Sequence, residues 1–265
     1  MAFKGNPYAR PDSKTMAAKN AGYPARSVFK LEEIDKRTRI LKQGQRVLDL
    51  GAAPGSWSMY ASGKVGGSGR VLAIDLSPLK VGVGKNATIV EGDAFEIGSD
   101  LYRQHGPFDV VLSDMAPSTT GNHAADQSRS FELVMRAVEV AMAHGNVGSS
   151  FVAKIFMSES YRDARDALRA GWTEVRTLRP EGTRPNSTEV FLVALGKKVG
   201  PTDPGHTAPA APAPAPAPPA PLPAPAASPV APAALPHAPI TPAPAKRTAA
   251  KSAPKKNSPT KKVRE

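Results

Sequence analysis

The chain contains no cysteine and no long apolar run. Its 265 residues include no Cys, so disulfide scaffolds and cysteine-ligated zinc or iron–sulfur sites are excluded. His105, His123 and His144 show no metal-ligand spacing, and no metal is expected. No apolar run approaches the ~18 residues that a membrane-spanning helix needs, and the N-terminus lacks the apolar core of a secretory signal. We therefore expect a cytoplasmic protein without membrane attachment.

Basic residues outnumber acidic ones, and they are unevenly distributed. There are 35 Lys+Arg and 23 Asp+Glu, a formal net charge of +12. The net charge is +7 over residues 1–46, −1 over residues 47–200 and +6 over residues 201–265. Such basic arms usually bind a polyanion, because each Lys or Arg that meets a phosphate releases counterions. Charge placement favours a nucleic-acid partner, and the alternative is that the charges serve solubility alone.

The composition divides the chain into three segments. Nineteen of the 28 prolines lie at or after Pro201, within an Ala/Pro-rich sequence that ends in a Lys-rich patch. We expect residues 200–265 to be a disordered tail, because they cannot bury enough apolar surface to fold. This tail is either a spacer whose basic end contacts RNA or a segment that only improves solubility. Residues 1–22 are expected to be a flexible basic arm without regular structure, which leaves a folded domain at residues 23–199.

The central segment has the pattern of an α/β protein. Short apolar runs alternate with helical stretches from Arg46 to Lys197, which indicates a sheet with helices on both faces. Helices are expected to begin near Ala25, to end at Gly145 and to span Glu159–Ala170. Seven strands are expected: Arg46–Leu50, Arg70–Leu76, Thr88–Glu91, Phe108–Asp114, Ser149–Phe156, Val175–Leu178 and Glu189–Leu195. No helix separates the last two, so the predicted fold is a doubly wound, mostly parallel, Rossmann-like sheet with an antiparallel pair at one edge.

The first strand leads directly into a glycine-containing turn, Asp49-Leu-Gly51-Ala-Ala-Pro-Gly55-Ser-Trp57. Ligands of such sheets bind at the carboxyl ends of the strands, and Gly51 and Gly55 would let the backbone approach a ligand closely. The dinucleotide fingerprint G-x-G-x-x-G is not met, because Ala53 and Ser56 replace its second and third glycines. A pyrophosphate ligand is therefore disfavoured.

Acidic residues end the next two strands. Asp75 is placed to accept hydrogen bonds from both ribose hydroxyls of an adenosine, and Asp93 to reach an adenine amino group. A glycine turn followed by strand-end carboxylates suits S-adenosylmethionine, which is cationic and lacks phosphates. The alternative is that these Asp residues, Asp93 more than Asp75, only form turns.

Five motifs, in this order, resemble the FtsJ/RrmJ family of S-adenosylmethionine-dependent 2'-O-ribose methyltransferases: SVFKLEEI, VLDLGAAPGSW, SDMAPSTTG, FVAKIF and STEVF. The resemblance covers about residues 20 to 198. It implies a catalytic set of Lys30, Asp114, Lys154 and Glu189, with cofactor contacts from Gly55, Trp57, Asp75, Asp93 and Asp114. The chain departs from the family at Ser56, where relatives usually show Gly, and at Phe191, where they often show Tyr.

The resemblance also implies a substrate. The bacterial members of the family modify a uridine of large-subunit (23S) ribosomal RNA, so we expect a ribosomal RNA methyltransferase that acts on the large subunit as a monomer. Two alternatives stay open. One is 2'-O-methylation of transfer RNA, and the other is a non-catalytic RNA-binding factor in ribosome assembly. A small-molecule methyltransferase is the least favoured, because the chain has no spare segment for a lid.

The chemistry requires a base beside the ribose hydroxyl. Lys154 lies inside the apolar run FVAKIF, and burial with a second ammonium nearby favours the neutral amine that can act as that base. We expect Lys30 to supply the second charge, and Asp114 and Glu189 to orient a lysine or the ribose. It is left open whether Lys154 abstracts the proton or only orients the hydroxyl.

Each of these residues also has a plain structural explanation. Lys30 would be solvated on its helix, and Trp57 would belong to the core. Asp114 would cap a turn, and Glu189 would pair with Arg184 at the surface.

Overall fold

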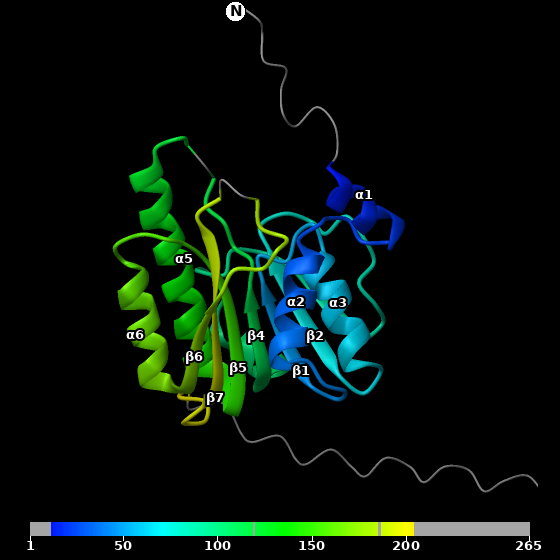
Figure 1. Ribbon diagram of the computed structural model, residues 1–265. Coiled ribbons are helices and arrows are strands. Elements are labelled where there is room, and N and C mark those ends of the chain that lie inside the picture. Colours follow the sequence, from blue (N-terminus) through cyan, green and yellow to red (C-terminus); the bar gives the residue numbers. More distant parts are fainter. Residues whose placement is uncertain (1–11, 119, 185–186, 204–265) are drawn as a thin grey trace, which may run out of the picture. The chain divides into compact units, whose positions relative to one another are not determined.

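Seven strands form one mixed sheet in the order β3-β2-β1-β4-β5-β7-β6 (Figure 1). The computed structural model describes residues 12–118, 120–184 and 187–203. The strands are β1 (Arg46–Leu50), β2 (Arg70–Asp75), β3 (Ala87–Glu91), β4 (Phe108–Ser113), β5 (Gly145–Phe156), β6 (Trp172–Leu178) and β7 (Glu189–Lys197). Neighbouring strands from β3 to β5 pair in parallel, and β7 runs antiparallel to both β5 and β6. The chain reverses its direction of travel across the sheet between β1 and β4, which is where such folds bind ligands.

Six helices lie in the described part of the chain: α1 (Ser13–Asn20), α2 (Val28–Thr38), α3 (Ser56–Val65), α4 (Ser99–His105), α5 (His123–His144) and α6 (Tyr161–Gly171). They form a layer on each face of the sheet. One apolar cluster joins α1, α2 and α3 to alternate strand residues such as Val47, Val152 and Phe191. The other joins α4, α5 and α6 to the residues between them, such as Leu48 and Ala153. Successive side chains of a strand point to opposite faces of the sheet, so each strand contributes apolar side chains to both layers.

The α/β fold class and the seven strands predicted from the sequence are confirmed. The expected antiparallel pair is β6 and β7, with β7 lying one position in from the edge. Strand bounds differ most at β5, which begins at Gly145 rather than Ser149. Gly145 pairs with Phe108 before the register shifts, so the polar start of β5 is held by backbone pairing that no apolar pattern marks. Gly145 also ends α5, as expected.

The expectation that residues 1–22 lack regular structure is wrong for α1. The side chain of Asp12 caps this helix by accepting a hydrogen bond from the amide of Thr15 at 2.7 Å. Ala18 is fully buried beside α2 and α3, and its neighbours in α1 are mostly exposed. The sequence did not predict this helix because it is mostly polar and Ala18 is its one buried residue. Residues 1–11 of the predicted arm lie outside the described residues.

The folded body continues past the predicted boundary at residue 199. The ammonium of Lys197 donates hydrogen bonds to the carbonyl oxygens of Gly200 (3.0 Å) and Met142 (2.6 Å). The carboxylate of Asp203 pairs with Arg103 at 2.8 Å, and the Asp203 side chain is only 7% exposed. Residues 200–203 therefore belong to the body, and the rest of the predicted tail lies outside the described residues. Among the described helices, none is long and apolar enough to cross a membrane.

Candidate active site

The turn after β1 brings two segments of backbone unusually close together. Gly51 has φ +75°, a conformation that favours glycine. A Cβ atom at this position would lie 2.7 Å from the backbone nitrogen of Met115, which follows β4. The turn then enters α3 at Ser56. The absence of a side chain at Gly51 is therefore what lets the ends of β1 and β4 lie together.

A cavity of about 420 Å³ opens beside this turn. Its lining follows the carboxyl ends of β1, β2, β3 and β4, so it lies where the chain reverses direction across the sheet. Three residues predicted to bind the cofactor, Gly51, Asp75 and Asp93, line it together. The three residues therefore lie together as expected from their positions after the strands, and their contact with the cofactor stays a prediction.

The two strand-end carboxylates are fixed by backbone amides. Asp75 accepts hydrogen bonds from the amides of Ala53 (2.9 Å) and Ser77 (2.8 Å), one at each carboxylate oxygen. Asp93 accepts one from the amide of Phe95 at 2.8 Å. A carboxylate has about four acceptor positions, so both side chains keep capacity for a ligand. Turn formation and ligand binding are therefore compatible at both positions.

The lining of this cavity fits S-adenosylmethionine better than a phosphate ligand. Its charged residues are Asp75, Asp93, Glu132 and a single cation, Arg129. This excess of carboxylates favours a cationic ligand and opposes a pyrophosphate. Apolar surface for a flat base is present too, since Leu76 and Phe95 line the cavity and remain 69% and 46% exposed.

Three other residues expected to contact the cofactor, Gly55, Trp57 and Asp114, do not line the cavity. The Trp57 side chain is 2% exposed, and its ring lies 5.8 Å from that of Phe191 in the core. A Cβ at Gly55 would lie 2.8 Å from Cγ2 of Val81, so its free face is covered by the loop after β2. The side chain of Trp57 thus has the core position that the sequence left open as an alternative.

Strand geometry explains how a lysine comes to lie among apolar residues in β5. Ala153 and Ile155 point into the layer under α5 and α6, whereas Val152 points to the opposite face. Lys154 shares the face of Val152 because side chains alternate along a strand. It lies near the carboxyl end of β5 and is 8% exposed. Its ammonium therefore emerges at the same sheet edge as the cavity.

Lys154 is held by the residue that follows β4. Its Nζ donates hydrogen bonds to the carbonyl oxygen of Asp114 at 2.7 Å and to Oδ1 of the same residue at 2.8 Å. Both side chains are largely buried, at 9% and 18% exposed. Asp114 directly precedes Met115, which lines the cavity. Asp114 therefore joins the cavity to Lys154.

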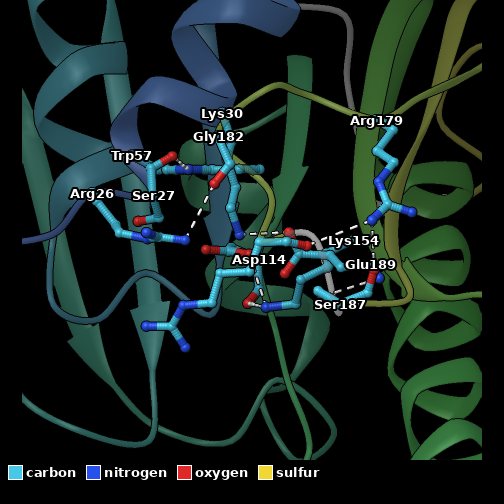
Figure 2. A network of polar contacts seen from close by, with 11 residues as sticks. Arg26, Ser27, Lys30, Trp57, Asp114, Lys154, Arg179, Gly182, Ser187 and Glu189 are labelled. Atoms are coloured by element: carbon cyan, nitrogen blue, oxygen red, sulfur yellow. Dashed lines mark hydrogen bonds and ion pairs between the residues drawn. The ribbon is translucent and has the colours of Figure 1, made fainter. Parts of the chain in front are cut away.

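A second lysine and carboxylate complete the cluster (Figure 2). Nζ of Lys30, on α2, lies 2.5 Å from Oε1 of Glu189, and these side chains are 13% and 11% exposed. Glu189 opposes Phe156 in the sheet register, two residues beyond Lys154, so Glu189 and Lys154 share one face. Figure 2 shows the four side chains converging from α2, the residue after β4, β5 and β7. Glu189 thus pairs with Lys30 in the interior.

Sequence reasoning missed one residue of this region, Asp49. It is fully buried in β1, where Ser58 donates a hydrogen bond to Oδ2 at 2.5 Å, and Oδ1 has no partner among the described residues. Burial raises the pKa of Asp49 to about 7; the Ser58 hydrogen bond acts in the opposite direction, and the charges of Asp114 and Asp75 add to the increase. A carboxyl group inside the apolar run RVLDL was the available signal.

Within the described ranges, no group of three or more His, Asp or Glu side chains is placed to hold a metal ion. The site consists of a cavity with carboxylates at the strand ends and, next to it, two lysine–carboxylate pairs, Lys154–Asp114 and Lys30–Glu189. Comparison with known proteins shows the family of this chain. The family model described as FtsJ-like methyltransferase matches residues 23–197.

This chain belongs to the FtsJ-like methyltransferases. It is 61% identical over 193 residues to the ribosomal RNA large subunit methyltransferase E of Sorangium cellulosum, covering 73% of this chain and 91% of that protein. The protein of that name from Bdellovibrio bacteriovorus is 47% identical over 185 residues, covering 68% of this chain and 94% of its own length. The family resemblance seen in the five sequence motifs is thereby confirmed.

A solved structure supports the fold of this FtsJ-like methyltransferase. A Plasmodium falciparum protein described as a ribosomal RNA methyltransferase aligns with a TM-score of 0.57 at 23% identity, covering 67% of this chain and 100% of the other. The family match contains all four residues of the lysine–carboxylate cluster. It leaves out α1 and residues 198–203, which pack against the family domain here.

Proposed function

We propose that this protein transfers a methyl group from S-adenosylmethionine to a ribose 2'-hydroxyl of large-subunit (23S) ribosomal RNA. The observation that supports it is the position of the lysine–carboxylate cluster. Asp114 belongs to this cluster, and the next residue, Met115, lines the cavity that fits the cofactor. A ribose bound at the cluster would therefore lie next to the methyl donor.

S-adenosylmethionine supplies a methyl group made electrophilic by its sulfonium, whereas a ribose hydroxyl is a poor nucleophile until its proton leaves. In the proposed mechanism Lys154 takes that proton. This step requires the neutral amine of Lys154, whose two N–H groups the two hydrogen bonds to Asp114 would then use. The remaining lone pair then faces the ribose and accepts the proton from O2'. The carboxylate of Asp114 stabilises the ammonium that forms.

Lys30 and Glu189 hold the nucleophile in place. The pairing with Glu189 uses one N–H of the Lys30 ammonium and leaves two further donors. We assign one of these to the 2'-oxygen, whose developing negative charge it stabilises. Because Glu189 is buried and fixed in β7, it limits the motion of the Lys30 side chain. Correct positioning of this kind accounts for a large part of the rate in reactions between two bound groups.

The substrate is tested by offering three RNAs separately with labelled S-adenosylmethionine. These are large ribosomal subunits, naked ribosomal RNA and transfer RNA, and the labelled product is mapped by the resistance of a 2'-methylated ribose to alkali. We expect label in ribosomal RNA of the large subunit. Label confined to transfer RNA would replace the proposed substrate. No label in any of the three would favour a non-catalytic RNA-binding role.

We also propose that the enzyme works as a monomer in the cytoplasm, where its ribosomal substrate is found. The exposed large apolar side chains of the described residues include Met16 on α1, Ile89 on β3 and Val147 on β5, whereas Leu76 and Phe95 line the cavity that fits the cofactor. Stable dimers usually bury a continuous apolar patch. Light scattering of the purified protein is expected to give the mass of one chain, and a mass of two would contradict this.

A further inference from the structure

Ser56 lies at the junction between the turn that follows β1 and the segment that leads into α2. It is the first residue of α3 and is 1% exposed. Its hydroxyl oxygen accepts a hydrogen bond from the amide of Ala25 at 2.9 Å and donates one to the carbonyl oxygen of Ala25 at 3.1 Å. One side chain thus occupies both backbone polar groups of a residue 31 positions earlier in the chain.

A second hydrogen bond from α3 reaches the backbone that holds Lys30. The indole Nε1 of Trp57 donates a hydrogen bond to the carbonyl oxygen of Ser27 at 2.9 Å. The amide of Lys30 donates to the same oxygen at 3.0 Å. Figure 2 shows the hydrogen bond between Trp57 and Ser27, with Lys30 nearby. The backbone position of Lys30 is therefore connected to α3 through one shared acceptor.

The start of α2 has no side-chain cap of its own. Ser27 occupies the N-cap position, and its hydroxyl makes no capping hydrogen bond. An N-terminal turn without a cap is weakly held by its own helix. The contacts from Ser56 and Trp57 supply that restraint from a different element. Contacts from α3 therefore help to fix the start of α2.

This restraint matters because Lys30 has to reach a fixed partner. Its ammonium meets Glu189 at 2.5 Å and lies 5.7 Å from the ring centre of Phe191. Both partners belong to β7, a different element from α2. A displacement of the first turn of α2 would change where the ammonium meets the ribose, and displacements of about 1 Å can cost 100-fold in rate.

We propose that Ser56 is a positioning residue that sets Lys30 relative to the methyl-donor cavity. Ser56 does not line that cavity, so it acts through α2 and not through contact with the donor. The inference rests on the proposed role of Lys30 at the ribose. It adds that the buried hydroxyl of Ser56 on α3 affects the position of Lys30, which contacts the ribose 2'-oxygen in the proposed mechanism.

Ser56→Ala is the test variant, and Ser62→Ala is its matched control. Ser62 lies in the same helix, is 7% exposed and uses its hydroxyl on Asn86 at 2.5 Å, away from α2. Each variant loses a buried hydroxyl from α3. Three measurements are made on both full-length proteins: single-turnover methyl transfer to large-subunit RNA, affinity for S-adenosylmethionine, and hydrogen exchange of the peptide covering residues 25–31.

For Ser56→Ala we expect a loss of about tenfold in methyl transfer, donor affinity within about twofold, and faster exchange at residues 25–31. Ser62→Ala is expected to leave all three near wild type. A similar loss in both variants, or unchanged exchange in Ser56→Ala, would overturn the inference. A loss of donor affinity in Ser56→Ala would assign it to the donor site instead.

Lys30→Ala separates this inference from the proposed function. If Lys30→Ala keeps wild-type transfer, the proposed role of Lys30 fails, whatever Ser56→Ala does. If Lys30→Ala is impaired, Ser56→Ala is expected to reduce the residual rate by much less than tenfold, because its effect passes through Lys30. If Ser56→Ala reduces the rate of methyl transfer by the same factor in wild type and in Lys30→Ala, a role through Lys30 is contradicted.

Discussion

Asp49 illustrates how a single buried carboxyl group can affect stability without touching the ribose site. It is fully buried under α3, and its pKa is raised to about 7, chiefly by loss of hydration. An aspartate in the unfolded chain titrates near its ordinary value of 3.8. Between these two values the folded protein keeps a proton that the unfolded chain has lost. Stability therefore falls as pH rises from about 4 to about 7 and is then constant with respect to this group.

Asp49→Asn removes this dependence while keeping the side chain's shape and an oxygen that can accept from Ser58. We expect wild type to lose on the order of 2 to 3 kcal/mol more than Asp49→Asn in free energy of unfolding between pH 5 and pH 8. Urea unfolding of both proteins at the two pH values measures the difference. Parallel losses in the two proteins would show that Asp49 ionises normally in the folded state.

At the scale of elements, the sequence predicted what lies at strand ends and missed what depends on distant contacts. Asp75 ends β2 and Asp93 lies two residues after β3, so their shared edge followed from the parallel pairing of these strands. The pairing of Lys30 with Glu189 links residues 159 positions apart, and no local pattern contains it. The family resemblance implied the set of two lysines and two carboxylates, and the structure shows which lysine pairs with which carboxylate.

Two further elements show why local patterns were insufficient. The helix α1 is polar throughout except for a few small or apolar residues, and burial of Ala18 became visible only with α2 and α3 in place. The indole of Trp57 follows the glycine turn in sequence, yet it points into the core toward Phe191. The direction of a side chain at the start of a helix depends on packing that a single sequence does not specify.

The turn after β1 gives the prediction that belongs to this scale. Gly51→Ala would place a Cβ 2.7 Å from the backbone nitrogen and 2.8 Å from the Cα of Met115, at φ +75°, and these backbone atoms cannot rotate aside as a side chain can. We expect S-adenosylmethionine affinity to fall at least about tenfold, because the strained turn must shift the cavity wall. Isothermal titration with the cofactor measures this.

Gly63→Ala is the matched control for this turn. It lies in α3, and its added Cβ would meet nothing within 4 Å. Its affinity for the cofactor should equal that of wild type, and its stability should rise by about 0.5 to 1 kcal/mol from helix propensity. Unchanged affinity in Gly51→Ala would mean that the turn can relax without altering the site.

At the scale of the whole molecule, positive charge is concentrated before and after residues 47–200. The central residues 47–200 have a net charge of −1, whereas residues 201–265 have +6. The described body ends with Asp203, whose carboxylate is bound to Arg103. The basic residues of the tail therefore follow a residue that is fixed to the body, and their contribution to RNA binding can be separated from that of the fold.

Deletion of residues 204–265 is expected to leave the melting temperature and cofactor affinity unchanged. RNA affinity should fall mainly at low salt, and the plot of log affinity against log salt should become shallower because fewer counterions are released. Equal loss of affinity at every salt concentration would contradict an electrostatic role. Deletion of residues 200–265 should in addition lower the melting temperature, since it removes the Asp203–Arg103 pair and an acceptor of Lys197.

The central claim is that Lys154 takes the proton of the ribose hydroxyl, and Lys154→Ala tests it most directly. The measurement is single-turnover methyl transfer to large-subunit ribosomal RNA, with S-adenosylmethionine affinity measured on the same preparation. Loss of a positioned base usually costs at least about 100-fold, so we expect transfer to fall by that factor or more, with cofactor affinity within about twofold of wild type. Turnover near wild type in Lys154→Ala would contradict the account.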